Sequence, residues 1–512
     1  MRKLLFITLC TFSSLALAQQ PPAAPAEGSD FSLTVYSTAD PATFDPQELA
    51  RQQIMNPYDR WQNRLPGYGV VRELRKIDLQ QGENTLRFTD VASGIDPTTV
   101  SFESKTAPDT TAVLEQNYEY DLVNFEALLG KFINKQITIT RNNRTFKATL
   151  LSSDPSSIIY REGDDPNGPV QVMGRDPNAI QLPDTRGLNT KPTLVWKVTA
   201  QRAGTHEAQV TYQTDGLTWR ADYNVVVNQN DSAADIGAWV TLLNQSGASY
   251  PNAKLKLVAG DVQRIQRRED QIYKRQEFQT LGSSRLNDGF QEKSFFEYHL
   301  YTLGRPTTVA QNSTKQIELF PQRNDVPVTK TYVYYGLPEQ FRLFVPSQPN
   351  PDRNLGLEMN KKVDIYLLMQ NSEKNGMGIP LPAGRIRVYK QDDADKSLEF
   401  VGEDVIHHTP KDEQVMIRLG SAFDVVGERK QTEFNVNVDE HWITESFEIK
   451  LRNHKKEPVK VIVKENLLRW TNWEITKSSD KYEKQDYRTI HIPVDVPVDG
   501  EKTVTYSVKY TW

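Results

Sequence analysis

The fold class is decided by residues 447–452, which read Phe447-Glu448-Ile449-Lys450-Leu451-Arg452 and alternate apolar with charged side chains. Because successive side chains of a strand point to opposite faces, this pattern predicts a strand with one face on a core and one in water. Residues 459–464 and 504–512 alternate in the same way. Short strands of this kind, separated by Pro, Gly, Asn and Asp and joined by few helices, predict an all-β protein built of antiparallel sandwiches.

The inner part of the chain predicts a small barrel. Residues 136–140 and 146–151 have the pattern of two strands around an Asn142-Asn143 turn, and three more short strands follow at 156–160, 170–173 and 179–182. Five short strands in so short a stretch are typical of SH3-like or Sm-like barrels.

Only two short helices are expected. Asp45-Pro46 is a helix start, with proline in the first turn, and predicts a helix through Ile54. Residues 123–132 predict the second helix.

Length and composition exclude several classes of protein. A chain of 512 residues is long enough for two to four domains with cores of their own. Hydrophobic residues make up 38% and charged residues 25%, which excludes a wholly disordered chain and a helical-bundle membrane protein. The 61 basic and 66 acidic residues give a net charge of −5, without the basic excess that a nucleic-acid backbone requires. No nucleic-acid partner and no transmembrane helix in the mature chain are therefore expected.

The first eighteen residues have the pattern of a secretory signal peptide. Arg2 and Lys3 supply the positive start and residues 4–15 a short apolar core, before a small-residue site that places cleavage between Ala18 and Gln19. This predicts an exported protein of the periplasm or cell surface.

Cleavage also removes the only cysteine, Cys10. The mature chain then has 59 basic and 66 acidic residues, a net charge of −7, and neither disulfides nor thiol chemistry. The alternative is a lipoprotein signal that uses Cys10, but Leu9 stands where such a signal needs a small residue.

The remaining chain divides into four parts. A Pro/Ala-rich tether covers residues 19–30, an N-terminal β region with a short helix covers 31–122, the small barrel covers 123–183, and further sandwiches cover 184–512. Residues 261–293 start with a polar, charge-dense run and predict a mobile excursion from the last part.

The last part of the chain carries a family resemblance. The stretches concerned are Gly216-Leu217-Thr218-Trp219 with Tyr223, 243–247, 252–260, 380–384 with Arg387-Val388-Tyr389, Gly402-Glu403-Asp404, His408-Thr409-Pro410, Ala422-Phe423-Asp424-Val425 and 506–512. Together they resemble the bacterial family catalogued as domain of unknown function 4139, some members of which are labelled mucoidy-inhibitor-like. Residues 68–102 resemble the region that precedes this domain in many members.

The resemblance implies an exported protein rich in β-sandwiches and no established activity. Many relatives carry a long coiled coil ahead of the domain. This chain has no sustained heptads, and the small barrel stands in that place instead, so a role that depends on the coiled coil does not carry over.

The densest group of possible metal ligands is Glu403, Asp404, His407, His408, Asp412 and Glu413. Imidazole nitrogens beside carboxylates can bind zinc or another divalent ion. Adjacent strand residues face opposite ways, however, so two neighbouring histidines cannot both bind one ion from a regular strand. The favoured interpretation is structural, with Asp404 and His408 fastening the Thr409-Pro410 loop by hydrogen bonds, and no metal or cofactor is predicted.

Other candidates are weaker. The turns at 164–168 and 392–395 are rich in Asp and Asn, but neither has the twelve-residue EF-hand pattern for calcium. Tryptophans 219, 239, 442, 470 and 473 are of the type that stacks on sugars, yet aromatic side chains on alternating strand positions usually fill a core. No Gly-x-Ser-x-Gly elbow and no phosphate-binding or dinucleotide-binding glycine motif is present.

These observations predict a non-enzymatic binding or scaffold protein of the bacterial cell envelope, with an envelope protein or a surface polysaccharide as its partner. The expected binding modes are strand addition at a sheet edge and contact through residues 261–293. The first alternative is an exported glycan or cell-wall hydrolase that uses paired carboxylates. The second is a divalent-metal protein built on His407 and His408.

Overall fold

The chain is described by a computed structural model that covers residues 30–37, 40–45, 48–49, 65–119, 125–183, 192–260, 262, 290–295, 298–342, 344–357 and 359–512. The expected signal peptide, nearly all of the tether and most of the helix expected over residues 45–54 lie outside these ranges. The same holds for most of the 261–293 excursion, although its last residues belong to a strand.

The all-β expectation is confirmed, because strands in four sheets make up most of the described ranges. The helical elements are short. In the described ranges they are two helical residues at 48–49, α2 (Phe125–Lys131), α3 (Glu339–Arg342) and the 3-10 turns Pro108–Thr110, Pro177–Ala179 and Glu373–Asn375. The position of α2 agrees with the helix expected near residues 123–132. No helix in the described ranges has the length and apolarity needed to cross a bilayer.

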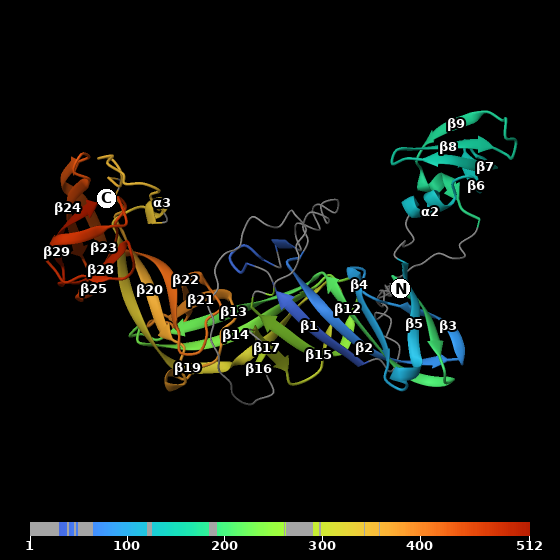
Figure 1. The fold of residues 1–512 in the computed structure, drawn as a ribbon, viewed down its shortest axis with the longest axis horizontal. Coiled ribbons are helices and arrows are strands. Elements are labelled where there is room, and N and C mark those ends of the chain that lie inside the picture. Colours follow the sequence, from blue (N-terminus) through green and yellow to red (C-terminus); the bar gives the residue numbers. More distant parts are fainter. Residues whose placement is uncertain are drawn as a thin grey trace, which may run out of the picture.

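Two of the sheets combine strands from before and after the small barrel (Figure 1). The eight-stranded sheet has the order β16-β17-β15-β1-β2-β12-β4, with β18 also paired to β15. Its strands are β1 (Asp30–Ser37), β2 (Gly67–Leu79), β4 (Ile95–Ser104), β12 (Gly204–Asp215), β15 (Tyr250–Ala259), β16 (Phe290–Phe295), β17 (Tyr298–Leu303) and β18 (Thr307–Val309). The three-stranded sheet places β11 (Thr193–Ala200) between β3 (Gly82–Thr89) and β5 (Thr111–Glu119). The segments on either side of the barrel therefore fold as one unit.

The five-stranded sheet is the small unit expected from the sequence. Its order is β10-β6-β7-β8-β9, and it has a hydrophobic core of its own. The strands are β6 (Gln136–Arg141), β7 (Arg144–Ser153), β8 (Ser157–Glu162), β9 (Val170–Gly174) and β10 (Ile180–Gln181). Asn142 and Asn143 form the β6–β7 turn with φ angles of 53° and 59°, the left-handed geometry of a tight hairpin.

The thirteen-stranded sheet runs the length of the C-terminal half. Its main order is β22-β21-β13-β14-β19-β20-β23-β24-β29-β26, and β25 joins it through β19 and leads on to β28 and β27. The strands are β13 (Leu217–Val227), β14 (Ala233–Asn244), β19 (Ser313–Tyr335), β20 (Lys362–Gln370), β21 (Gly384–Gln391), β22 (Leu398–Ile406), β23 (Gln414–Asn437), β24 (Trp442–Asn453), β25 (Val459–Asn466), β26 (Trp473–Ser478), β27 (Glu483–Lys484), β28 (Thr489–Val496) and β29 (Gly500–Thr511).

Two long strands join two separate cores. The first part of β19 pairs with β14 and its last part with β20 and β25, while β23 pairs first with β20 and then with β24. With about 3.3 Å of rise per residue, the 23 residues of β19 span roughly 75 Å. Figure 1 accordingly shows the C-terminal strands at the opposite end of the molecule from β3 and β5.

The first core lies between the eight-stranded sheet, the three-stranded sheet and the first strands of the long sheet. Trp196 packs in it against Phe88 and Phe102, with ring centroids 5.5 and 5.2 Å away. The second core is formed mainly by β24 and β29 on one side and β25 and β28 on the other. Along β24 every second residue is buried, which confirms the alternation that the sequence showed over residues 447–452.

Candidate functional site

A cavity of about 370 Å³ opens where the two cores meet. Leu367 on β20 belongs to the first core and Tyr332 on β19 to the second, and both side chains line the cavity. Its remaining apolar walls are Val227, Ile365, Val401, Leu419, Ala422 and Phe423. Its volume lies within the range of about 300–1,000 Å³ that is usual for small-molecule sites, and such sites favour junctions between structural units.

A bulge in β23 shapes one side of the cavity. Asp364 and Lys362 on β20 are two residues apart, whereas their partners on β23, Ser421 and Val426, are five apart. The extra residues on β23 have no partner on β20, so the strand bulges before its pairing with β24 begins at Val425.

The bulge presents an aromatic side chain to solvent. Phe423 is 95% exposed and lines the cavity mouth. Nearby, β22 exposes Leu398, Phe400 and Val401, of which Val401 also lines the cavity. Large apolar side chains that gather at a cavity in this way mark interaction surfaces, whereas single exposed residues do not.

Two lysines and an aspartate form one charged side of the mouth. The Lys390 ammonium donates to Asp231 Oδ1 at 2.6 Å, and Lys330 donates to the other oxygen of the same carboxylate. Asp231 reaches this position from the β13–β14 turn, which Asn228 closes by accepting a hydrogen bond from the Ser232 N–H at 3.0 Å. Burial by itself raises the pKa of Asp231, but the two lysines outweigh it and hold that pKa below its usual value, so Asp231 is ionised at neutral pH.

A third lysine, Lys455, also lines the cavity. The Lys455 ammonium donates to the Tyr332 hydroxyl at 3.0 Å and to Glu457 Oε1 at 2.5 Å. Burial lowers the pKa of Lys455, but Glu457 and Tyr332 raise it to a net value above the usual one, so its charge persists at neutral pH.

The lining combines apolar side chains with a small set of charged ones. The described lining residues contain no histidine or cysteine, and their only carboxylates are those of Asp231 and Asp424. Asp231 is held between two ammonium groups and is no proton donor at neutral pH. The three lysines and the carboxylates of Asp231 and Asp424 stand beside an apolar interior, and Glu457 pairs with Lys455.

Glu403 and Asp404, which the sequence singled out, lie on β22 outside this cavity lining. Asp404 Oδ2 accepts a hydrogen bond from the backbone N–H of Arg418 at 2.7 Å, and so fastens β22 to the neighbouring β23. Glu403 is exposed and pairs with Arg387 at 3.4 Å. The two carboxylates thus have different structural partners.

His407 and His408 follow the end of β22, and both are exposed. His408 Nδ1 accepts a hydrogen bond from the Ala383 N–H at 3.0 Å, while the His407 carbonyl accepts one from the Thr409 hydroxyl at 2.9 Å. His408 therefore holds the segment before β21, and Asp404 ties β22 to β23. In the described part of the chain, no three His, Cys, Asp or Glu side chains gather as metal ligands.

The aspartate-rich turns are closed by their own side chains. Asp165 Oδ1 accepts from the Asn167 N–H at 2.9 Å, and Asp392 Oδ1 accepts from the Ala394 N–H at 2.7 Å. These bonds stabilise the turns as ordinary Asx turns.

The tryptophans fall into two groups. Trp219 is buried, and its indole N–H donates to the Val35 carbonyl at 3.2 Å. Trp470 and Trp473 are half-buried against the second core, and Trp442 is half-buried and bonds Glu440. Trp239 is the exception, because it is 41% exposed on β14.

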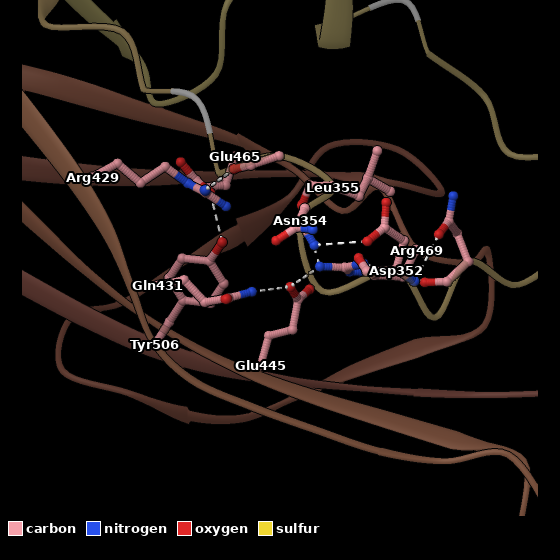
Figure 2. Close-up of polar contacts among 11 residues, drawn as sticks. Asp352, Asn354, Leu355, Arg429, Gln431, Glu445, Glu465, Arg469 and Tyr506 are labelled. Atoms are coloured by element: carbon pink, nitrogen blue, oxygen red, sulfur yellow. Dashed lines mark hydrogen bonds and ion pairs between the residues drawn. The ribbon is translucent and has the colours of Figure 1, made fainter.

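The neighbouring second core contains two buried carboxylates, Glu445 on β24 and Glu465 on β25 (Figure 2). Glu465 Oε2 accepts from Arg429 Nε at 2.8 Å and from the Tyr506 hydroxyl at 2.6 Å. Glu445 Oε1 accepts from Arg469 and from Gln431, both at 2.8 Å.

This network fastens a loop. Arg469 donates to the carbonyls of Asn350, Asp352 and Leu355, and Arg429 to that of Gly356 at 3.1 Å. The space beside it is only about 10 Å³, which is room for a single water molecule. We call Arg429, Glu445, Glu465, Arg469 and Tyr506 the buried polar network.

A serine–histidine pair is buried between β4 and β12. Ser104 Oγ is 2.9 Å from His206 Nδ1, and both residues are almost fully buried. His206 Nε2 faces the Arg202 carbonyl at 3.2 Å instead of a carboxylate. Because a carbonyl can only accept, the proton of the imidazole is on Nε2, and Nδ1 accepts the hydrogen bond from the Ser104 hydroxyl. The pair thereby links β4 to β12.

Sequence reasoning missed the charged mouth of the cavity. Asp231, Lys330, Lys390 and Lys455 lie up to 224 residues apart and share no motif. Phe423 did have a local signal, because it interrupts the alternation of β23 between Ala422 and Asp424.

Comparison with known proteins gives one family. Residues 208–512 match the family model described as "Domain of unknown function (DUF4139)". No curated protein matches the chain. The matched residues include every strand from β13 to β29 and thus the whole lining of the cavity.

Proposed function

Because the chain belongs to the DUF4139 family, for which no activity is defined, we propose from its geometry that it is an exported, non-enzymatic binding or scaffold protein of the cell envelope. The observation that carries the proposal is the open cavity between the two cores, with the exposed Phe423 at its mouth. An aromatic side chain so exposed beside an apolar cavity loses unfavourable contact with water when a partner covers it.

Export is part of the proposal. It is supported by the signal-like residues 1–18, with cleavage between Ala18 and Gln19, and places the protein in the periplasm or at the cell surface. The partner is an envelope protein or a surface polysaccharide that docks at the cavity mouth. The series of connected sheets fits a scaffold.

Crosslinking mass spectrometry on intact envelopes of the native host tests this function. We expect reproducible crosslinks from lysines 330, 390 and 455 to one envelope component, and their loss in Phe423→Ser. Tyr482→Ser, which alters another exposed aromatic side chain away from the mouth, is the matched control and should keep them. The proposal fails if these lysines give no crosslink to any envelope component, or if both variants reduce the links equally.

A further inference from the structure

We propose that the cavity between the two cores binds an anionic amphiphile with a single acyl chain, of the fatty-acid type. This inference rests on the proposed binding function and names its ligand. Two features of the site carry it, an apolar interior and a pair of lysines at the mouth that share one carboxylate.

The interior suits an acyl chain. Leu367 and Val227 are buried, and Ile365, Leu419 and Ala422 are partly exposed where they face the cavity. An acyl chain that enters such walls leaves water at about 25 cal/mol for each Å² of apolar surface buried.

The mouth suits an anionic head group. Lys330 and Lys390 share the single carboxylate of Asp231, so these three residues hold two ammonium groups and one carboxylate. Lys455 faces the same mouth and is compensated by Glu457. A carboxylate that enters between the lysines gains charge-assisted hydrogen bonds without displacing Asp231.

The exposed aromatic side chain completes the fit. Phe423 stands at the entrance and is almost fully exposed in the described structure. Its ring can pack along the part of an acyl chain that emerges from the cavity, which shields both apolar surfaces from water.

Laurate is the probe, and its displacement of a fluorescent fatty acid from the purified full-length protein is the measurement. We expect saturable binding of laurate and at least about tenfold weaker binding of dodecanol, which has the same chain length without the charge. Lys390→Met should weaken laurate binding about fivefold and leave dodecanol binding unchanged. Lys450→Met, which removes a lysine on β24 outside the cavity, is the matched control and should bind laurate normally.

Filling the cavity gives a second test. Leu367→Trp should abolish binding of both probes, and Ala422→Trp, at a partly exposed wall, serves where the buried substitution prevents folding. Equal affinity for laurate and dodecanol, or unchanged binding in Lys390→Met or Ala422→Trp, overturns the amphiphile proposal. If laurate does not bind while the Phe423-dependent envelope crosslinks persist, the ligand class is wrong and the binding function stands.

Discussion

Replacement of Arg429 by methionine should destabilise the C-terminal unit strongly. The Arg429 guanidinium is buried and pairs with Glu465, whose side chain is fully buried. Arg429 also stacks on the Phe447 ring, 3.8 Å from its centroid. Burial lowers the pKa of Arg429, but Glu465 and Tyr506 reverse this and raise it above its usual value, as expected for a tightly paired cation.

The magnitude follows from the charge that is left behind. Arg429→Met keeps the apolar volume but leaves the Glu465 carboxylate buried with only the Tyr506 hydroxyl as partner. Removal of one member of a buried ion pair costs about 3–5 kcal/mol. The double variant Arg429→Met with Glu465→Leu has no buried charge, and it leaves only the Gly356 carbonyl and the Tyr506 hydroxyl unpaired. Each costs about 1 kcal/mol or somewhat more, so the double variant should be more stable than either single variant.

Urea unfolding followed by circular dichroism gives the free energy of unfolding, and hydrogen exchange of peptides from β24 and β29 locates the change. Arg452→Met is the matched control. Arg452 pairs with Glu428 at 3.2 Å with both side chains at least a third exposed, so its loss should cost less than about 1 kcal/mol. The reasoning is refuted if Arg429→Met lowers the free energy of unfolding by less than about 1 kcal/mol. It is also refuted if the loss in the double variant equals the sum of the losses in the two single variants.

Three further predictions concern the remaining units. Burial raises the pKa of Glu73 in the folded protein. Its contribution to the free energy of unfolding is therefore complete below the ordinary pKa of 4.5 and is lost as pH rises through the raised folded pKa. Glu73→Gln should remove this decline, and urea midpoints measured from below pH 4.5 to neutrality test it. Gly427→Ala places a Cβ against the Tyr334 ring and should cost about 1–3 kcal/mol, whereas Gly237→Ala, with open space around its Cβ position, should cost little in the same thermal-melting assay. Asp404→Ala should cost about 1 kcal/mol and speed hydrogen exchange in β22, and unchanged exchange there would contradict its role in fastening β22 to β23.

Local alternation was enough to find the strands. Residues 447–452 were predicted to bury every second side chain, and β24 does so from Ile443 to Asn453. The five short strands of the small unit and the Asn142-Asn143 turn were also visible, because hairpin turns leave a local sequence signal.

The sequence did not show which strands pair with each other. β1 lies between β15 and β2, although more than 200 residues separate it from β15. Alternation shows which face of a strand is buried, but it does not show which strand lies beside it. For this reason a sequence boundary at residue 184 separates strands that share one sheet.

The sequence by itself determined the fold class, the small five-stranded unit and the family, because each depends on short-range patterns and local motifs. Only the tertiary structure decided the candidate site. Asp231, Lys330, Lys390 and Lys455 come together because β19 and β23 change partners between the two cores and leave an opening there. The physical reason is that a binding site depends on which surfaces meet in space, and non-local strand pairing sets those meetings.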